Sequence, residues 1–254
     1  MKANVDTQRS AEAYLAHLGN PEAVALRQST CDVLAQALAT TGAVLWAFGM
    51  AEQPRRSVAA AIQMGGETAR GAAALLRDSN RYGAAALVRQ LLEIEYLLCL
   101  FAKDRDEPSK WASMDFDAVR REYQPARMRK RCGDRFRSSE YSVHCQVGGH
   151  PRYAAAYVLP EHLRPGPFSE QVILATGWVD LGQHLVQIWK WVEDVLVEYD
   201  LGQVGLAKSS LAKAKDAVAS WLSADMCASL LTEAESSFLA QASAKPDAER
   251  PVRS

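Results

Sequence analysis

The run GAAALVRQLLEIEYLLCLFA, from Gly83 to Ala102, is the most apolar stretch in this chain of 254 residues. It is long enough to span a bilayer. Arg89, Glu93 and Glu95 lie in its middle, however, where a charge is costly inside a membrane. We therefore expect this run to be the central helix of a soluble bundle.

Helical patterns with clear start signals surround that central run. Asn20-Pro21 opens a long helix to about Phe48, and Ser169 opens another to about Tyr199. No segment alternates polar and apolar residues over the length of a strand, and no Asn-Gly or Asp-Gly hairpin signal is present. We predict an all-α single domain, 1–243, of about eight or nine helices, followed by a disordered tail, 244–254. Further helices are expected near 6–18, 54–80 with a weak point at Gly65-Gly66, from Pro108, and near 126–147, 204–222 and 225–242. The segment 148–168 is expected to be one long Pro/Gly-rich loop.

The N-terminus, the cysteine spacing and the missing motifs exclude several classes of protein. The N-terminus has no apolar signal core, and the five cysteines form no Cys-x-x-Cys pair, which predicts a cytoplasmic protein with free thiols. No nucleotide-binding glycine loop, His-Glu-x-x-His or Gly-x-Ser-x-Gly motif is present. The chain therefore lacks the common sequence signatures of catalysis.

The stretch from Arg120 to Arg137 is strongly basic. It carries eight Arg or Lys residues against two acids, although the whole chain holds 29 basic and 30 acidic residues. Such a concentration favours RNA or another polyanion as partner, and the aromatics Tyr123, Phe136 and Tyr141 could stack bases. The alternative is a solvated helix face balanced by acids on neighbouring helices.

Two polar groups lie on the expected helices. Arg89 and Glu93 are four residues apart and share a face, either as an internal salt bridge or as the lining of a polar pocket. Arg137 and His144 are two turns apart, and with Tyr141 they would form a polar surface strip. His144 would lie near a helix C-terminus, which favours the imidazolium. A histidine that moves protons beside a fixed arginine is a plausible phosphodiester-cleaving pair.

The motif Arg137-Ser-Ser-Glu-Tyr-Ser-Val-His144 resembles the Arg-x(4–6)-His signature of the HEPN superfamily. Members are all-helical, and many are metal-independent ribonucleases that act as dimers, whereas others only bind. The resemblance implies Arg137 and His144 as catalytic residues, a homodimer, and a toxin or defence role. Arg131 and Arg135 of the basic stretch are further candidate binding residues.

A second resemblance covers roughly residues 60–200. Arg89-x(3)-Glu93 followed by Tyr141-x(3)-Cys145-x(4)-His150-Pro151 is similar to a widespread group of uncharacterised bacterial helical proteins, described only as a domain of unknown function. It implies a binding site of Arg89, Glu93, Tyr141 and His150, in a non-catalytic bundle that binds a protein or small ligand. The two resemblances choose different histidines, and the sequence leaves that choice open.

A third polar group follows one face of the 169–199 helix, where Asp180 and His184 are four residues apart. With Glu93 and a loop histidine, His150, they could form a His/carboxylate metal site in a bundle core. The chain has no Glu-x-x-His pair of the di-iron type. We therefore favour an Asp–His pair that satisfies a partly buried imidazole, and we predict no metal and no cofactor.

Overall fold

The computed structural model of the protein describes residues 12–47, 52–133, 136, 138–149, 153–159, 169–201 and 205–228. All regular structure within these ranges is helical, without a strand, which confirms the all-α prediction. None of the helices in the described part has the length and apolarity needed to cross a membrane. The tail predicted at 244–254 lies outside the described residues.

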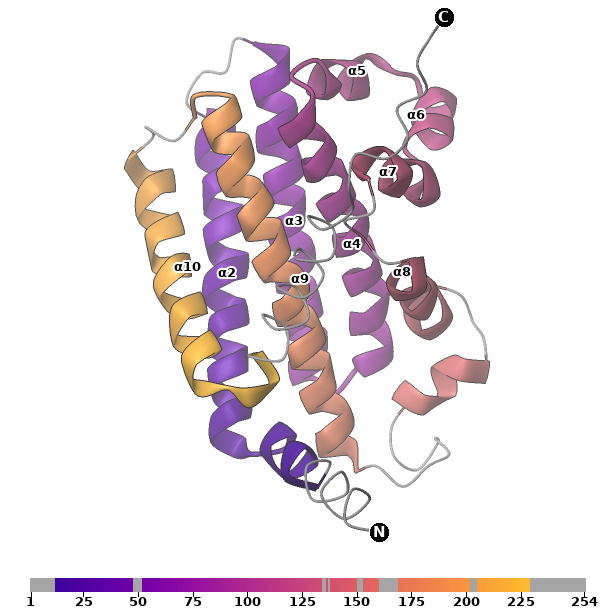
Figure 1. Ribbon diagram of the computed structural model, residues 1–254, viewed down its shortest axis with the longest axis vertical. Helices are drawn as coiled ribbons and strands as arrows, with labels where there is room; N and C mark the ends of the chain where they lie inside the picture. The colour runs from indigo at the N-terminus through magenta and orange to yellow at the C-terminus, as the bar shows by residue number, and fades with distance from the viewer. Residues whose placement is uncertain are drawn as a thin grey trace, which may run out of the picture.

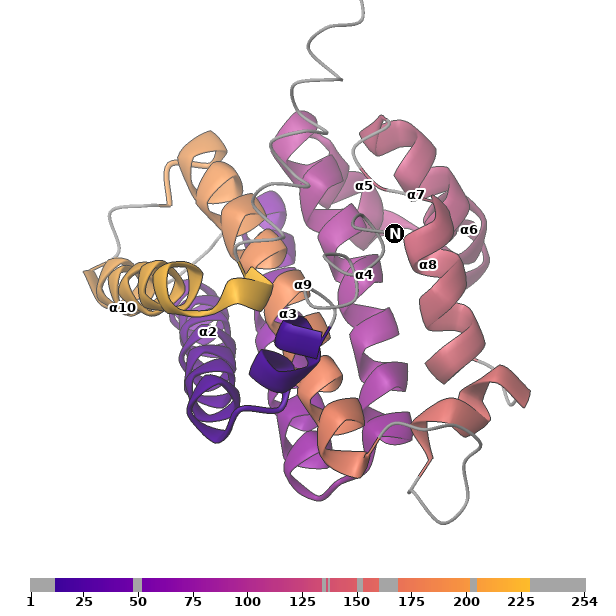
Figure 2. The same ribbon diagram turned by 60° about the horizontal axis from the view of Figure 1, so that its bottom comes forward.

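Five long helices form the bundle (Figure 1). Helix α9 packs against α2, α3 and α4, and α10 covers the outer side of α2. A series of short helices lies along the side of α4, away from α10, as Figures 1 and 2 both show. The long helices are α2 (Pro21–Ala47), α3 (Gln53–Arg77), α4 (Arg81–Lys103), α9 (Glu170–Glu198) and α10 (Gly205–Ala224).

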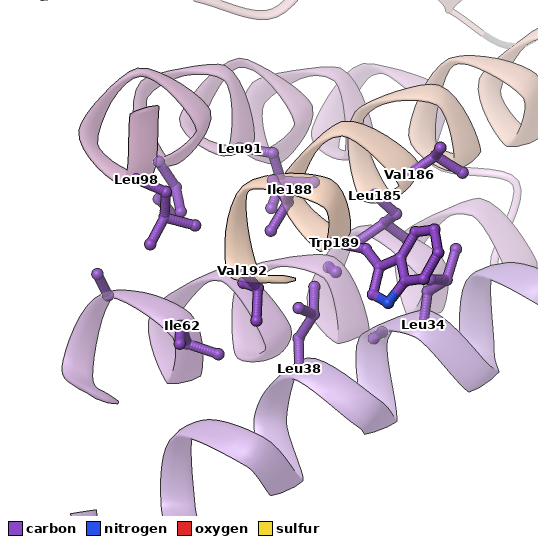
Figure 3. Packing of buried hydrophobic residues seen from close by; sticks show 14 of the residues in the cluster. Leu34, Leu38, Ile62, Leu91, Leu98, Leu185, Val186, Ile188, Trp189 and Val192 are labelled. Atoms are coloured by element: carbon purple, nitrogen blue, oxygen red, sulfur yellow. The ribbon is translucent and has the colours of Figure 1, made fainter. Parts of the chain in front are cut away.

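One large apolar core lies between α2, α3, α4 and α9 (Figure 3). Leu34 and Leu38 of α2 face Ile188 and Val192 of α9 across it. Apolar side chains recur every three or four residues on each helix, so each helix presents one stripe to this core. Burial of these stripes is the main force that holds the helices together.

The helix starts predicted at Asn20-Pro21 and at Ser169 are confirmed, and capping side chains explain them. Asn20 Oδ1 accepts hydrogen bonds from the backbone of Glu22 and Ala23, and Ser169 Oγ accepts one from Val172. Each cap satisfies backbone N–H groups that have no partner inside the helix. Asn80 caps α4 in the same way, through Gly83.

The expected weak point at Gly65-Gly66 is wrong, because α3 runs through it without a break. A Cβ added to Gly66 would lie 2.2 Å from the backbone nitrogen of Ala39. A Cβ added to Gly42 would lie 2.4 Å from the backbone nitrogen of Gln63. These glycines therefore let α2 and α3 touch backbone to backbone.

The expected basic helix at 126–147 is also wrong. Helix α7 ends at Cys132, and Gly133 then adopts a φ of +77°, which a glycine tolerates. Phe136 packs edge-on against Tyr96 of α4, with ring centroids 4.5 Å apart. The chain thus breaks where it meets α4. The short helices are α5 (Glu107–Ser113), α6 (Phe116–Glu122), α7 (Pro125–Cys132) and α8 (Ser138–His144).

The segment expected to be one long loop, 148–168, is partly helical. Helix α8 continues as a π-helical segment, η1 (Cys145–Gly149), and a 3-10 segment, η2 (Tyr153–Val158), follows. These extra segments make the number of helices slightly higher than predicted. Segments of π-helix occur often at functional sites.

Candidate functional site

A buried glutamate on α4 faces a buried histidine on α9. Glu95 is 3% exposed and His184 is 2% exposed. Glu95 Oε1 lies 2.8 Å from His184 Nδ1. Because a carboxylate accepts hydrogen bonds, the imidazole donates from Nδ1 and keeps the lone pair on Nε2.

That lone pair points at a second histidine. His184 Nε2 lies 3.1 Å from Nε2 of His144, which is 7% exposed at the end of α8. The two rings meet edge to face, with centroids 5.0 Å apart. One hydrogen atom, carried by His144 Nε2, can therefore join the two nitrogens.

Asp180 completes this group from one helical turn before His184. Its Oδ1 lies 3.5 Å from His144 Nε2 and 3.6 Å from His184 Nε2. About a fifth of the Asp180 side chain is exposed, so it is the most open of the three residues. We call His144, Asp180 and His184 the His–Asp–His centre.

The separations within the His–Asp–His centre suit a metal ion. Ions such as Zn²⁺ bind imidazole nitrogen and carboxylate oxygen at about 2.0–2.2 Å, so their ligand atoms lie roughly 2.8–3.6 Å apart for ligand–metal–ligand angles between about 90° and 110°. The three separations here are 3.1, 3.5 and 3.6 Å. Glu95 would be the outer partner that orients a histidine ligand. Two histidines and one carboxylate are a donor set for first-row transition metals.

His144 is neutral in the folded protein. Burial lowers the pKa of His144 to about 4, and the charge of Asp180 offsets only part of this effect. The nearby His184 and Arg81 lower this pKa further. A neutral imidazole is the form that binds metal ions.

Arg81, the first residue of α4, borders the centre. Its Nη2 donates to Asp180 Oδ2 over 2.9 Å, and its side chain is 9% exposed. The buried Nε and Nη1 of Arg81 have no hydrogen-bond partner among the described residues. A Cβ added to Gly177 would lie 2.7 Å from Arg81 Cδ, so that glycine makes room for the side chain.

The π-helical segment η1 seats His144 against α4. A Cβ added to Gly148 would lie 2.4 Å from the backbone carbon of Ala85. Only a glycine permits this approach without a shift. The Gly148-Gly149 pair, expected to end the helix, thus continues it and presses it onto the bundle.

Arg89, Glu93 and Tyr141 lie together in a separate group. Arg89 pairs with Glu93 over 2.8 Å, and its Nη2 donates to the Tyr141 hydroxyl over 2.9 Å. Tyr141 donates to Glu93 over 3.2 Å. Burial raises the pKa of Tyr141 to about 12, although the hydrogen bond from Arg89 acts the other way. Arg89 and Glu93 remain about one-third exposed.

The remaining predicted site residues have different positions. Arg135, Arg137 and His150 lie outside the described residues. Arg131 pairs with the buried Glu107 of α5. His144 is in the core, so its expected place in a surface strip is wrong, and burial outweighs the expected dipole effect on its pKa. The expected Asp180–His184 pair is also incomplete, because Glu95 is the carboxylate that hydrogen-bonds His184.

The sequence analysis missed Glu95 and Arg81 as site residues. Glu95 lies two positions after Glu93, about 200° around the helix, and so faces the opposite side. It occupies a position in the apolar stripe of Val88, Leu91 and Leu92, where a carboxylate needs a partner. That position in the stripe was the available signal for Glu95.

Comparisons of the chain with protein-family models, with curated proteins and with solved structures found no match.

Proposed function

We propose that this protein is a metal-dependent enzyme whose His–Asp–His centre holds one divalent transition-metal ion. The observation that carries the proposal is the convergence of the two Nε2 atoms and Asp180 Oδ1, all within 4.8 Å of one another. Two of these ligand atoms come from α9 and one from the end of α8. The centre therefore depends on how these helices pack.

The donor set favours a catalytic ion over a structural one. Structural zinc sites close with four protein ligands, whereas catalytic sites use three and leave a position for water or substrate. The described residues supply three ligand atoms, because Glu95 is engaged with His184 Nδ1. A bound ion would act there as a Lewis acid or activate a water molecule.

Protein residues prepare the centre for the ion. The hydrogen bond to Glu95 selects the His184 tautomer whose Nε2 carries a lone pair and faces His144. Arg81 holds Asp180 through Oδ2 and leaves Oδ1 toward the histidines. Metal binding would require the hydrogen on His144 Nε2 to move to Nδ1, so that the ion would bind two neutral imidazoles.

Metal titration of the purified apoprotein tests this proposal. We expect one equivalent of Zn²⁺ or Co²⁺ to bind, with the stoichiometry and affinity measured by calorimetry. Asp180→Asn should weaken binding, whereas Asp194→Asn, at an exposed position of the same helix, should not. Failure of Zn²⁺, Co²⁺, Mn²⁺, Fe²⁺ and Ni²⁺ to bind the folded apoprotein would contradict the proposal.

RNA or another polyanion remains a second candidate, as a binding partner. Arg120 and Arg121 on α6 are exposed, Arg129 on α7 is partly buried, and none of the three has an ion pair among the described residues. Tyr123 and Phe136 pack inward, which leaves this surface to phosphate contacts. Such binding should weaken steeply with salt, and charge reversal of these arginines should abolish it.

Metal-independent RNA cleavage by Arg137 and His144, which the HEPN resemblance implies, stays a prediction, as does the homodimer. Arg137→Ala and His144→Ala should both abolish cleavage in the presence of a chelator. The burial of His144 is the reason that we rank this activity below the metal centre. Ligand binding through Arg89, Glu93 and His150 likewise stays a prediction.

A further inference from the structure

Arg81 has more hydrogen-bonding capacity than the fold uses. Its Nη2 is bound to Asp180, while Nε and Nη1 are buried and have no partner among the described residues. Buried guanidinium groups are normally paired through several of their five donors. The unused donors, one N–H on Nε and two on Nη1, therefore point to a ligand of this side chain.

The unused donors lie beside the His–Asp–His centre. Arg81 Nη2 is 2.9 Å from Asp180 Oδ2, and the other oxygen of that carboxylate faces both histidines. The two oxygens share one carbon, with C–O bonds of about 1.2–1.3 Å, so Nη2 is within roughly 5.5 Å of Oδ1. One small group can thus reach both the guanidinium and an ion in the centre.

A glycine on α9 leaves room for the Arg81 side chain. Gly177 lies one turn before Asp180 on α9, and a Cβ there would be 2.7 Å from Arg81 Cδ and 2.8 Å from Nε. Any other residue would push the guanidinium away from α9. Residues of both α4 and α9 therefore fix the position of Arg81.

The net charge of the centre indicates whether its ligand is an anion or a cation. With both carboxylates ionised, Arg81 and a divalent ion carry three positive charges against the two negative charges of Asp180 and Glu95. The centre then has a net charge of about +1, which one monoanion neutralises. A planar carboxylate also matches the fork of a guanidinium, and the burial of the centre restricts access to a small group.

We infer that Arg81 anchors the carboxylate of a small substrate, in such a way that the same substrate reaches the open position of the metal ion. This inference rests on the proposed metal centre. A phosphate monoester shares the oxyanion chemistry, but its second charge is in excess here. Carboxylate should therefore bind more tightly than phosphate.

Anion titration of the Co²⁺-loaded protein tests the inference through the visible spectrum of the ion. Acetate should change the wild-type spectrum, and inorganic phosphate should do so more weakly. Arg81→Gln should weaken acetate binding about ten-fold or more, with Co²⁺ affinity reduced much less. Arg77→Gln, in a surface pair with Asp32, is the control and should bind acetate as the wild type does.

The outcomes separate the two proposals. If the folded protein takes up neither Co²⁺ nor any of the other four ions named above, the metal centre is wrong. If Co²⁺ binds but acetate acts equally on wild type and Arg81→Gln, or on neither, the anchor is wrong and the centre stands. Should Arg81→Gln fail to fold, Arg81→Lys keeps the charge without the fork. It should still lose acetate affinity, and unchanged affinity would overturn the inference.

Discussion

Glu95 Oε1 and His184 Nδ1 face each other in the bundle core at 2.8 Å, although 89 positions separate the two residues in the chain. Each would be costly to bury alone, and together they satisfy one hydrogen bond. The pair joins α4 to α9 and turns the other nitrogen of His184 toward His144 and Asp180. It is the contact on which the candidate centre depends.

Glu95→Gln should weaken metal binding about ten- to a hundred-fold, as the loss of an outer carboxylate commonly does. The amide can still accept the hydrogen bond, but it does not increase the basicity of the imidazole. Competition with a chromophoric chelator measures the change. Glu93→Gln is a matched control two residues away on the opposite side of α4, and equal losses in both variants would contradict the assignment.

Gly148→Ala should both destabilise the protein and weaken metal binding. The new Cβ would lie 2.4 Å from the Ala85 backbone, so η1 must move off α4 and carry His144 with it. We expect a loss of about 1–3 kcal/mol in the free energy of unfolding, typical of overpacking. Gly205→Ala is the control, because nothing lies within 4 Å of that position. Normal metal affinity in Gly148→Ala would show that η1 does not position His144.

Tyr141→Phe should cost stability without changing the metal centre. It removes the hydrogen bonds of the hydroxyl with Arg89 and Glu93, worth about 0.5–1.5 kcal/mol each. Denaturant unfolding and Co²⁺ titration of the same variant check both statements. A large loss of Co²⁺ affinity would mean that the two polar groups act as one site.

Asp225 should make stability depend on pH. Burial by itself would raise the pKa of Asp225, but hydrogen bonds from Arg27, Trp221 and the Cys227 backbone hold it well below its ordinary 3.8. His17 and Tyr14 also face this carboxylate. Because the folded-state pKa is the lower one, the stabilisation is present above pH about 4 and is lost as the pH falls further.

Unfolding measured between pH 7 and pH 3 tests the role of Asp225. Asp225→Asn should be less stable than wild type at pH 7 by about 3–5 kcal/mol, because Arg27 is left buried and unpaired. The difference should shrink toward acid pH. Asp32→Asn, which breaks only the exposed pair with Arg77, should change stability by less than about 1 kcal/mol. Similar losses of stability in both variants would contradict a stabilising buried ion pair between Arg27 and Asp225.

Parts of the candidate site could be predicted from the sequence alone. Arg89 with Glu93, and Asp180 with His184, are four residues apart, and helical spacing is enough to place each pair on one face. Glu95 and Arg81 could not be assigned in that way. Their partners, His184 and Asp180, lie on α9, and the spacing within α4 carries no information about that helix.

The sequence by itself determined that the protein is all-helical, and it determined where α2, α4 and α9 begin, because capping and apolar periodicity act within a few residues of the chain. Only the tertiary structure decided that Glu95 rather than Glu93 is buried, and that His144 enters the core. It also decided that Gly66 and Gly148, at positions expected to weaken or end a helix, lie where two helices touch. Those outcomes depend on which helix faces which, and burial acts between segments far apart in the chain.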